Sequence, residues 1–282
     1  MKVATRFILL LAVLIAIGVG LSVAALGYLG GIFPDPSILK KEYPVVVYRG
    51  PKVPVTVKFQ KARPTGWISL KAVSPRVLGA IIVSEDWNFY QHKGYDAFEI
   101  KEAIRKDLTT GHFSRGASTL TQQMVKNVFL SNEKSLLRKA KELFLAIESE
   151  SALGKSKILE VYLNVVEFGE GIYGIGHAAS FYFGKDAGDL NAREAAFIAM
   201  LLPSPKRYSA SFRKKELTKY AAKTIRAIIQ KMEKGHYISA EERDQGLSTL
   251  LNFESHRVDD GSELSVEEEA PNPEPANDDE EF

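Results

Sequence analysis

Two adjacent carboxylates are the residues best suited to chemistry in this chain. Glu85 and Asp86 follow the apolar run AIIV at 80–83 and precede the aromatic cluster WNFY at 87–90. A carboxylate at the end of an apolar helix, beside aromatic rings, is placed to have a raised pKa. A group with such a pKa can act as a general base or acid near neutral pH. An exposed pair of acids at a helix end is the alternative interpretation of this segment on its own.

A second segment, GASTLTQQMVKN at 116–127, contains hydroxyl, amide and ammonium groups at helical spacing. If a helix begins at Ser118 or Thr119, one stripe of that helix carries Thr119, Gln122, Gln123 and Lys126. Together with the helix N-terminus, these groups suit the oxygen atoms of a phosphate or a sugar. A polar stripe of this kind is otherwise a solvated helix face.

A third segment, LLRKAKELFLAIE at 136–148, places one carboxylate between two cations. Glu142 follows Arg138 by four residues and Lys139 by three, so the three side chains are neighbours on a helix. One interpretation is a surface salt bridge worth under about 1 kcal/mol, and the other is a second active-site carboxylate in a basic pocket. The apolar residues of this helix are expected to form one buried face, made of Leu137, Ala140, Phe144 and Ile147.

A fourth segment, ILEVYLNVVEFG at 158–169, is apolar but carries Glu160 and Asn164 one helical turn apart. Buried polar groups on an apolar helix usually make structural hydrogen bonds. We expect this role for both residues rather than direct catalysis.

The elements that position these segments are expected to be mostly helices, so the fold class is mainly α. Three capping-box patterns predict helix starts, at Thr119, Asn191 and Ser239. Pro203 is expected to end the second of these helices, and residues 213–234 predict a basic amphipathic helix. Short extended pieces are expected in YPVVVY and VPVTVKF, where prolines interrupt them.

Composition and charge exclude several classes of protein. Of the 282 residues, 45% are hydrophobic and 26% charged, which excludes wholesale disorder or a fibrous repeat. The chain has no cysteine, which excludes disulfide frameworks, thiolate metal sites and cysteine nucleophiles. Residues 259–282 contain 11 Asp/Glu and no Lys/Arg, so residues 1–258 carry 37 basic and 24 acidic side chains, a net charge of +13. Such a body favours an anionic partner: phosphate, nucleic acid or an acidic membrane.

Residues 7–33 form an uninterrupted run without charged side chains. Because a membrane span needs roughly 20 such residues, we expect an uncleaved transmembrane anchor, with a cleaved signal peptide as the alternative. The positive-inside rule places residues 1–6 in the cytoplasm. The expected organisation continues with a juxtamembrane stalk at 34–66, a main domain at 67–258 and a disordered acidic tail at 259–282.

Taken in order, the segments resemble five motifs of the peptidoglycan glycosyltransferase family (glycosyltransferase family 51). The motifs are Glu85-Asp86-x-x-Phe89-x-x-His92-x-Gly94; Gly116-x-Ser118-Thr119-x-Thr121-Gln122-Gln123-x-x-Lys126-Asn127; Arg138-Lys139-x-x-Glu142; Ile158-Leu159-Glu160-x-Tyr162-Leu163-Asn164 through Tyr182-Phe183-Gly184-Lys185; and Ala199-Met200-Leu201-Leu202-Pro203-x-Pro205-x-x-Tyr208. The resemblance covers roughly 67–209, and VEFGEGIYG at 166–174 is most similar to the monofunctional biosynthetic transglycosylase branch. Alanine stands at 117, where many members have glycine, and the acidic tail lies outside the resemblance.

The resemblance implies a lysozyme-like glycosyltransferase domain that polymerises lipid II, a disaccharide-peptide on undecaprenyl pyrophosphate, into β-1,4 strands with inversion. It implies that Glu85 is the general base and that cations neutralise the leaving pyrophosphate. The candidates for binding that group are Lys126, Arg138 and Lys139, with Gln122 and Gln123 as hydrogen-bond donors and Ser118 as a helper.

The roles of three further groups stay open. Glu142, the second carboxylate, orients the cations, holds a divalent ion or stabilises an oxocarbenium-like centre. Asp86 is a weaker candidate for orienting Glu85 or the loop after it, and for His92 a structural hydrogen bond is favoured over substrate contact. No cofactor is required, and Mg²⁺ or Mn²⁺ near the pyrophosphate is the one candidate.

The implied location is the bacterial inner (cytoplasmic) membrane, with a single-pass anchor and the catalytic domain on the extracytoplasmic side. Residues 97–115 mix apolar and basic side chains and are expected to be mobile and to enter the membrane interface, with an ordinary packed helix as the alternative. The expected partners are lipid II, the growing glycan chain, the membrane and cell-wall or division proteins, and not nucleic acid.

Rival functions are a lytic lysozyme-like enzyme and a non-catalytic scaffold. A bifunctional penicillin-binding protein is disfavoured, because the Ser-x-x-Lys sequences have no Lys-Thr-Gly partner.

Overall fold

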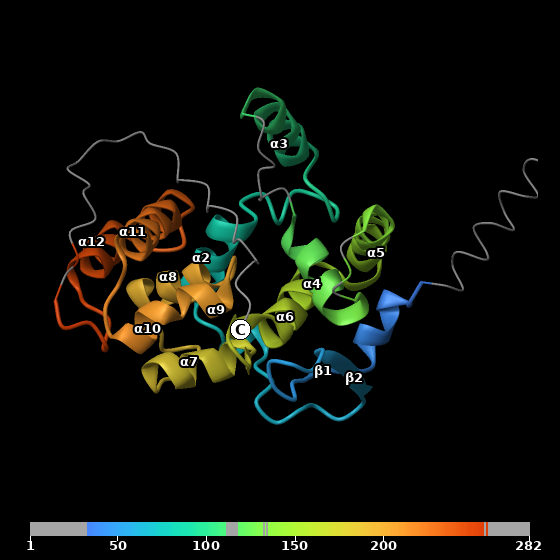
Figure 1. Ribbon diagram of the computed structural model, residues 1–282, viewed down its shortest axis with the longest axis horizontal. Helices are drawn as coiled ribbons and strands as arrows, with labels where there is room; N and C mark the ends of the chain where they lie inside the picture. The colour runs from blue at the N-terminus through green and yellow to red at the C-terminus, as the bar shows by residue number, and fades with distance from the viewer. Residues whose placement is uncertain (1–32, 111–117, 132, 134, 257, 259–282) are drawn as a thin grey trace, which may run out of the picture. The chain divides into compact units, whose positions relative to one another are not determined.

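The computed structural model describes residues 33–110, 118–131, 133, 135–256 and 258, and these are mainly helical (Figure 1). Both sheets in this part of the chain are two-stranded. In chain order the elements are the 3₁₀ helix η1 (Pro36–Lys40), β1 (Tyr43–Val47), β2 (Thr56–Gln60), the 3₁₀ helix η2 (Leu70–Ala72), α2 (Pro75–Glu85), α3 (Ala97–Thr110), α4 (Leu120–Phe129), α5 (Leu136–Leu153), α6 (Lys155–Val165), β3 (Glu167–Gly169), β4 (Ile172–Tyr173), α7 (Ile175–Phe183), α8 (Ala192–Leu201), α9 (Pro205–Tyr208), α10 (Ala210–Lys214), α11 (Lys219–Lys234) and α12 (Ala240–Ser248).

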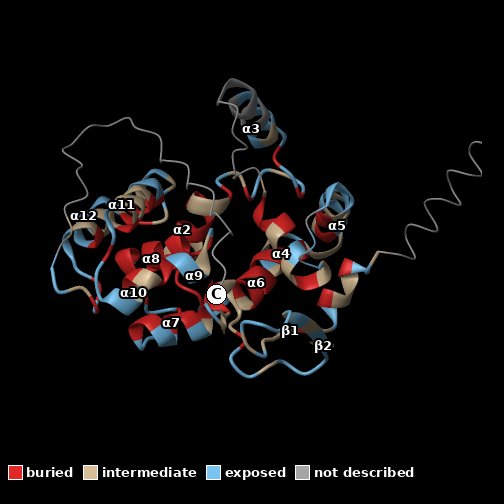
Figure 2. Ribbon diagram, viewed as in Figure 1, coloured by how far each residue is buried: buried red, intermediate tan, exposed pale blue. Residues whose placement is uncertain are grey.

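Helix α8 is the centre of one helical group. All ten of its residues are buried, and it packs against α2 and α11 (Figure 2). Three of its four alanines, Ala195, Ala196 and Ala199, are fully buried and leave little side-chain volume, so the axes of neighbouring helices can approach closely. Asn191 begins α8 with a capping box and the helix ends before Pro203, which confirms both predictions. This packing fixes α2, the helix that ends in Glu85.

A second group consists of α4, α5 and α6, with the β1–β2 hairpin beside α6. The hairpin pairs Tyr43 with Gln60 and Val47 with Thr56, which confirms the predicted extended pieces. On β2, the ring of Phe59 stacks on Phe129 of α4 with centroids 5.9 Å apart. The hairpin therefore contacts both α4 and α6 from one side.

Helix α5 buries a different face from the one predicted. Leu137, Ala140, Phe144 and Ile147 are all exposed. The buried side consists of Glu142, Leu145, Ala146 and Ser149. The small residues on this side allow a close approach of neighbouring backbone: a Cβ on Gly94, which has φ +97°, would lie 2.9 Å from the Ala146 carbonyl carbon. A paired carboxylate can be buried here because Arg138 and Lys139 neutralise it.

The predicted helix at 213–234 is shorter in the structure. Helix α10 stops where Lys215 adopts a left-handed conformation with φ 59°. Helix α11 begins only at Lys219, where the Thr218 side chain caps it by accepting a hydrogen bond from the Ala221 backbone N–H. A local turn and a cap therefore override the continuous amphipathic pattern.

In the described part of the chain, no helix combines the length and the apolar character that a membrane span needs. The predicted anchor at 7–33 lies outside the described residues except for Phe33. The predicted acidic tail at 259–282 also lies outside them.

Replacing Ser239 with Ala tests the capping box of α12. The Ser239 hydroxyl accepts from the Glu242 backbone N–H at 3.2 Å, and the Glu242 carboxylate accepts from the Ser239 N–H at 2.9 Å. Loss of this cap is expected to lower the free energy of unfolding by about 1 kcal/mol, measured by denaturant titration. Ser248→Ala, at the other end of the helix, is the control and is expected to change stability less. Equal effects of the two variants would contradict the prediction.

Candidate functional site

The Glu85 carboxylate lies at the C-terminal end of α2, and only Ser84 separates it from the buried apolar run that ends at Val83. The Gln123 side-chain N–H donates to Glu85 Oε2 at 2.8 Å. Burial raises the pKa of Glu85 above its ordinary range, and the adjacent charge of Asp86 adds to the rise. The hydrogen bond from Gln123 and the positive charge of Lys126 on α4 oppose the rise in part. Glu85 is thus a carboxylate with an increased proton affinity that is still partly accessible from solvent.

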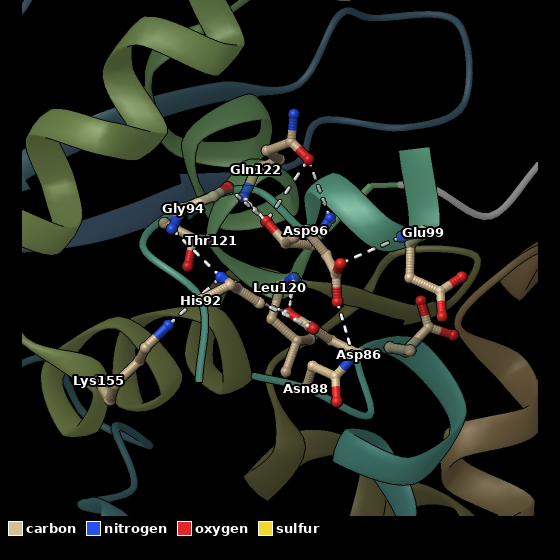
Figure 3. A network of polar contacts seen from close by, with 12 residues as sticks. Asp86, Asn88, His92, Gly94, Asp96, Glu99, Leu120, Thr121, Gln122 and Lys155 are labelled. Atoms are coloured by element: carbon tan, nitrogen blue, oxygen red, sulfur yellow. Dashed lines mark hydrogen bonds and ion pairs between the residues drawn. The ribbon is translucent and has the colours of Figure 1, made fainter. Parts of the chain in front are cut away.

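Asp86 is the C-terminal cap residue of α2 and connects this helix to the start of α4. Its carboxylate accepts from the Leu120 backbone N–H at 2.8 Å and from His92 Nε2 at 2.9 Å (Figure 3). The Gly94 N–H donates to His92 Nδ1 at 3.2 Å, so Nδ1 is the acceptor and Nε2 carries the donated proton. The structure contains a hydrogen bond of the kind favoured for His92, and Asp86 joins the loop that follows Glu85 to the start of α4.

Behind His92 lies a polar network that the sequence analysis did not find. Lys155 Nζ is 3.5 Å from His92 Nδ1 and 4.5 Å from the centroid of the Phe89 ring. It donates to Glu150 at 2.7 Å, and Glu150 also accepts from the Thr121 hydroxyl at 2.5 Å. The network joins α4, α5 and the start of α6 behind the Glu85 loop.

Helix α4 begins with the predicted capping box at Thr119. The box uses Gln122: its side-chain oxygen accepts from the Thr119 N–H at 3.0 Å, and the residue is 2% exposed. The Gln122 side-chain oxygen therefore serves the helix cap, and its role as a hydrogen-bond donor to substrate stays a prediction. Gln123 instead faces Glu85, and Lys126 is exposed on the same helix.

Glu142 on α5 is 2% exposed and holds two cations. Arg138 Nη1 donates to Glu142 Oε2 at 2.7 Å, and Lys139 Nζ donates to Oε1 at 2.5 Å. Lys139 also donates to the Ser118 hydroxyl at 2.9 Å, just before α4. Since each carboxylate oxygen already binds one cation, Glu142 is placed to orient Arg138 and Lys139 at the beginning of α4.

These residues do not suit a protein-held divalent ion. Within the part of the chain that the structure describes, no group of three or more His, Asp or Glu side chains could hold a metal ion. Both oxygens of Glu142 are engaged by cations, which disfavours a metal ion beside them.

Glu160 and Asn164 fasten α6 to the segment at 67–70. Glu160 accepts from the Trp67 indole N–H at 3.2 Å and from the Leu70 backbone N–H at 3.1 Å. The Asn164 side chain accepts from the Ile68 N–H and donates to the Ile68 carbonyl oxygen, both at 2.8 Å. Both side chains thus make structural hydrogen bonds of the kind that the sequence predicts.

The predicted interfacial segment at 97–115 coincides with α3 up to Thr110, and residues 111–117 lie outside the described residues. Asp96, which sequence reasoning missed, fastens the start of α3 by accepting from the Phe98 N–H at 2.8 Å and from Asn88 Nδ2 at 2.8 Å. Burial acts to raise the pKa of Asp96, but the hydrogen bonds from Asn88 and the backbone keep that pKa below its ordinary range. The spacing Asp96-x-x-Glu99 was the available signal for this cap.

Tyr162 on α6 is a further residue of the site whose role sequence reasoning missed. Its ring is fully buried and its hydroxyl donates to Gln123 Oε1 at 3.2 Å. The signal in the sequence was weak, because a tyrosine among apolar residues on a helix is usually a core residue.

The family model for transglycosylases matches residues 53–233, well over half of the chain. The chain belongs to the transglycosylase family. Over 158 residues it is 44% identical to the Biosynthetic peptidoglycan transglycosylase of Shewanella amazonensis, covering 56% of this chain and 62% of that protein. Over 259 residues it is 34% identical to Penicillin-binding protein 1A of Escherichia coli, covering 91% of this chain and 30% of that protein. The chain thus spans less than two thirds of the length of these two relatives.

A further transglycosylase relative is matched over more of its length. The chain is 38% identical over 168 residues to the Biosynthetic peptidoglycan transglycosylase of Nitrosospira multiformis, covering 60% of this chain and 71% of that protein. Among solved structures, the crystal structure of Penicillin-Binding Protein 1A from Haemophilus influenzae aligns with 74% of this chain and 21% of that chain, with a TM-score of 0.34 and 19% identity. The relatives at 38–44% identity support placement in the monofunctional branch of the transglycosylase family.

Proposed function

We propose that this protein is a peptidoglycan glycosyltransferase that polymerises lipid II into β-1,4 glycan strands and releases undecaprenyl pyrophosphate. The observation that carries the proposal is the Glu85 carboxylate with its raised pKa, held by Gln123 on α4. The cation pair on Glu142 contacts Ser118 at the start of the same helix. One short helix therefore joins a base to positive charges, the two components that sugar transfer from a pyrophosphate needs.

In the proposed reaction, Glu85 accepts the proton of the C4 hydroxyl of the acceptor sugar. That oxygen forms a bond to the anomeric carbon C1 of the growing chain. The bond between C1 and the pyrophosphate oxygen breaks, and its electron pair leaves with the undecaprenyl pyrophosphate. Attack from the opposite face converts the α-linkage of the donor into a β-linkage.

The cations act on the leaving group in this mechanism. Pyrophosphate leaves readily once its charge is neutralised, so electrostatic stabilisation matters more than proton donation. Arg138 and Lys139, held by Glu142, and the exposed Lys126 are the groups proposed for this work.

Activity is expected to fall on the acid side along a limb set by Glu85. The base works only as the carboxylate, so kcat/KM should rise as the pH increases through the pKa of Glu85 and level off above it. Because that pKa is raised, the limb should lie at higher pH than for an ordinary glutamate. Initial rates of lipid II polymerisation measured from acid to neutral pH check this expectation, and a limb at the ordinary glutamate position would contradict it.

Contact with a membrane belongs to the same proposal. An exposed apolar face of α5, with Leu136 92% and Leu137 68% exposed, and the exposed Phe98 of α3 support contact of these two helices with a bilayer. We place the catalytic domain, of lysozyme-like fold, outside the inner membrane, with residues 7–33 as a single anchor and residues 97–115 at the interface. This arrangement suits a substrate whose lipid remains in the bilayer.

The test is to incubate the purified protein with lipid II and, separately, with intact sacculi. Glycan polymer from lipid II is the expected product. Soluble fragments from sacculi, without polymer from lipid II, would favour the rival lytic enzyme. Release of neither product would favour a scaffold, and in that case Glu85→Gln should leave cellular function intact.

A further inference from the structure

Three residues from three helices form a hydrogen-bonded line that ends on the proposed base. The Tyr162 hydroxyl, on α6, donates to Gln123 Oε1 at 3.2 Å. Gln123, on α4, donates through Nε2 to Glu85 Oε2 at 2.8 Å. Glu85 is the last residue of α2. Since α4 and α6 pack directly against each other, Tyr162 reaches Glu85 through a single side-chain amide.

The chemistry of an amide gives this line a direction. One end of the Gln123 amide only accepts hydrogen bonds and the other end only donates them. An ionised carboxylate only accepts, so the Glu85 carboxylate requires the NH₂ end, and the amide oxygen must then face Tyr162. A neutral phenol can donate to that oxygen, and burial keeps Tyr162 neutral by raising its pKa well above the ordinary range.

We propose that Tyr162 is a positioning residue for Glu85, because its hydroxyl fixes the Gln123 amide with the NH₂ group toward the carboxylate. This assignment rests on the proposed function. It means that Tyr162 affects catalysis without contacting substrate. Without the hydroxyl, the amide oxygen loses its fixed partner and the NH₂ group is held on Glu85 less firmly. The ionised form of Glu85 then loses part of its stabilisation, whereas the charges of Asp86 and Lys126 that act on it are unchanged.

The test variant is Tyr162→Phe, which keeps the ring and removes only the hydroxyl. The acid limb of kcat/KM for lipid II is expected to move to higher pH by about half a unit to one unit, the size that corresponds to one lost hydrogen bond. The decrease in rate below the limb should appear in kcat rather than in KM, since no substrate contact is removed. In a Gln123→Met background, Tyr162→Phe should move the limb little, because the Tyr162 hydroxyl acts on Glu85 only through the Gln123 amide.

Tyr182→Phe is the matched control. Tyr182, on α7, is also buried. Its hydroxyl donates to the Phe168 carbonyl oxygen at 2.9 Å. Both variants should lose a similar amount of thermal stability, but only Tyr162→Phe should move the acid limb. If Tyr162→Phe loses stability and its limb stays at the wild-type position, its hydroxyl is merely structural and the proposal is overturned.

A second readout separates this proposal from the proposed function. The carboxyl carbon of Glu85 can be titrated by NMR in protein with ¹³C-labelled glutamate, its signal being assigned by its absence in Glu85→Gln. The midpoint of that titration should rise in Tyr162→Phe and not in Tyr182→Phe. A wild-type protein that makes no polymer would refute the glycosyltransferase, whereas an unchanged midpoint in Tyr162→Phe would refute the positioning role.

Discussion

Replacing Glu85 with Gln is expected to lower the rate of lipid II polymerisation by about 10²–10⁴-fold, the usual contribution of a positioned base. Glutamine has nearly the same shape, and its amide oxygen can still accept from Gln123, so the site should keep its geometry. It cannot take a proton from the acceptor hydroxyl at neutral pH. The measurement is the initial rate of polymer formation at saturating lipid II, where the loss should appear in kcat.

The same substitution should raise the free energy of unfolding at neutral pH. The pKa of Glu85 is higher in the folded protein than in an unfolded chain, so ionised Glu85 destabilises the fold. This destabilisation is absent at pH values below the pKa of Glu85 in the unfolded chain. It grows as the pH rises from that pKa to the higher pKa of Glu85 in the folded protein. Denaturant titrations at several pH values should therefore show Glu85→Gln becoming more stable than wild type as the pH rises through that interval.

Glu233→Gln is the control for both measurements. Glu233 lies on α11 and forms a partly exposed ion pair with Arg243 at 2.9 Å. Its loss should change stability by under about 1 kcal/mol and leave the rate unchanged. If Glu85→Gln retained activity within tenfold of wild type, another group would have to be the base.

The sequence was most informative where the signal was local. The capping boxes at Thr119, Asn191 and Ser239 are present in the structure because a cap depends on residues three positions apart. The structural roles of Glu160 and Asn164 also followed from a local rule, namely that polar groups on an apolar helix must find partners.

Prediction was weaker where two local patterns competed. Helix α5 has an apolar stripe through Leu137 and Phe144, and beside it a stripe of small residues with Glu142. Hydrophobicity favours burial of the first stripe, but the structure buries the second, where Ala146 admits Gly94 and Glu142 is neutralised by its cations. Which stripe of α5 is buried depends on contacts with residues distant in the chain, and the periodicity of the α5 sequence carries no information about those contacts.

The adjacent glutamines of α4 show the same limit at the level of the site. Both lie on the predicted polar stripe, but Gln122 is part of the capping box, whereas Gln123 donates a hydrogen bond to Glu85. The capping pattern Thr119-x-x-Gln122 was visible in the sequence and would have separated the two residues. The partner of Gln123, Tyr162, is 39 positions away and could be found only from the packing of α4 on α6.

Replacing Glu142 with Gln is expected to lower kcat/KM for lipid II by about 10²-fold or more. The neutral amide cannot hold both Arg138 and Lys139, whose charges are proposed to stabilise the leaving pyrophosphate, and loss of one oriented donor already costs about 10²–10³-fold in kcat. The free energy of unfolding should fall by about 1.5–3 kcal/mol, the value of a hydrogen bond to a charged group. Glu148→Gln, an exposed acid on the same helix, is the control and should change neither quantity by much.

A double-mutant cycle with Arg138→Ala distinguishes the roles that the sequence left open for Glu142. If Glu142 acts by orienting its cations, part of its effect disappears once Arg138 is absent. The loss of kcat/KM in the double variant should then be smaller than the product of the losses in the two single variants. If Glu142 instead stabilises positive charge on the anomeric carbon directly, its effect does not depend on Arg138. The loss of kcat/KM in the double variant should then equal the product of the two single losses. The first outcome is expected, because both carboxylate oxygens of Glu142 already bind a cation.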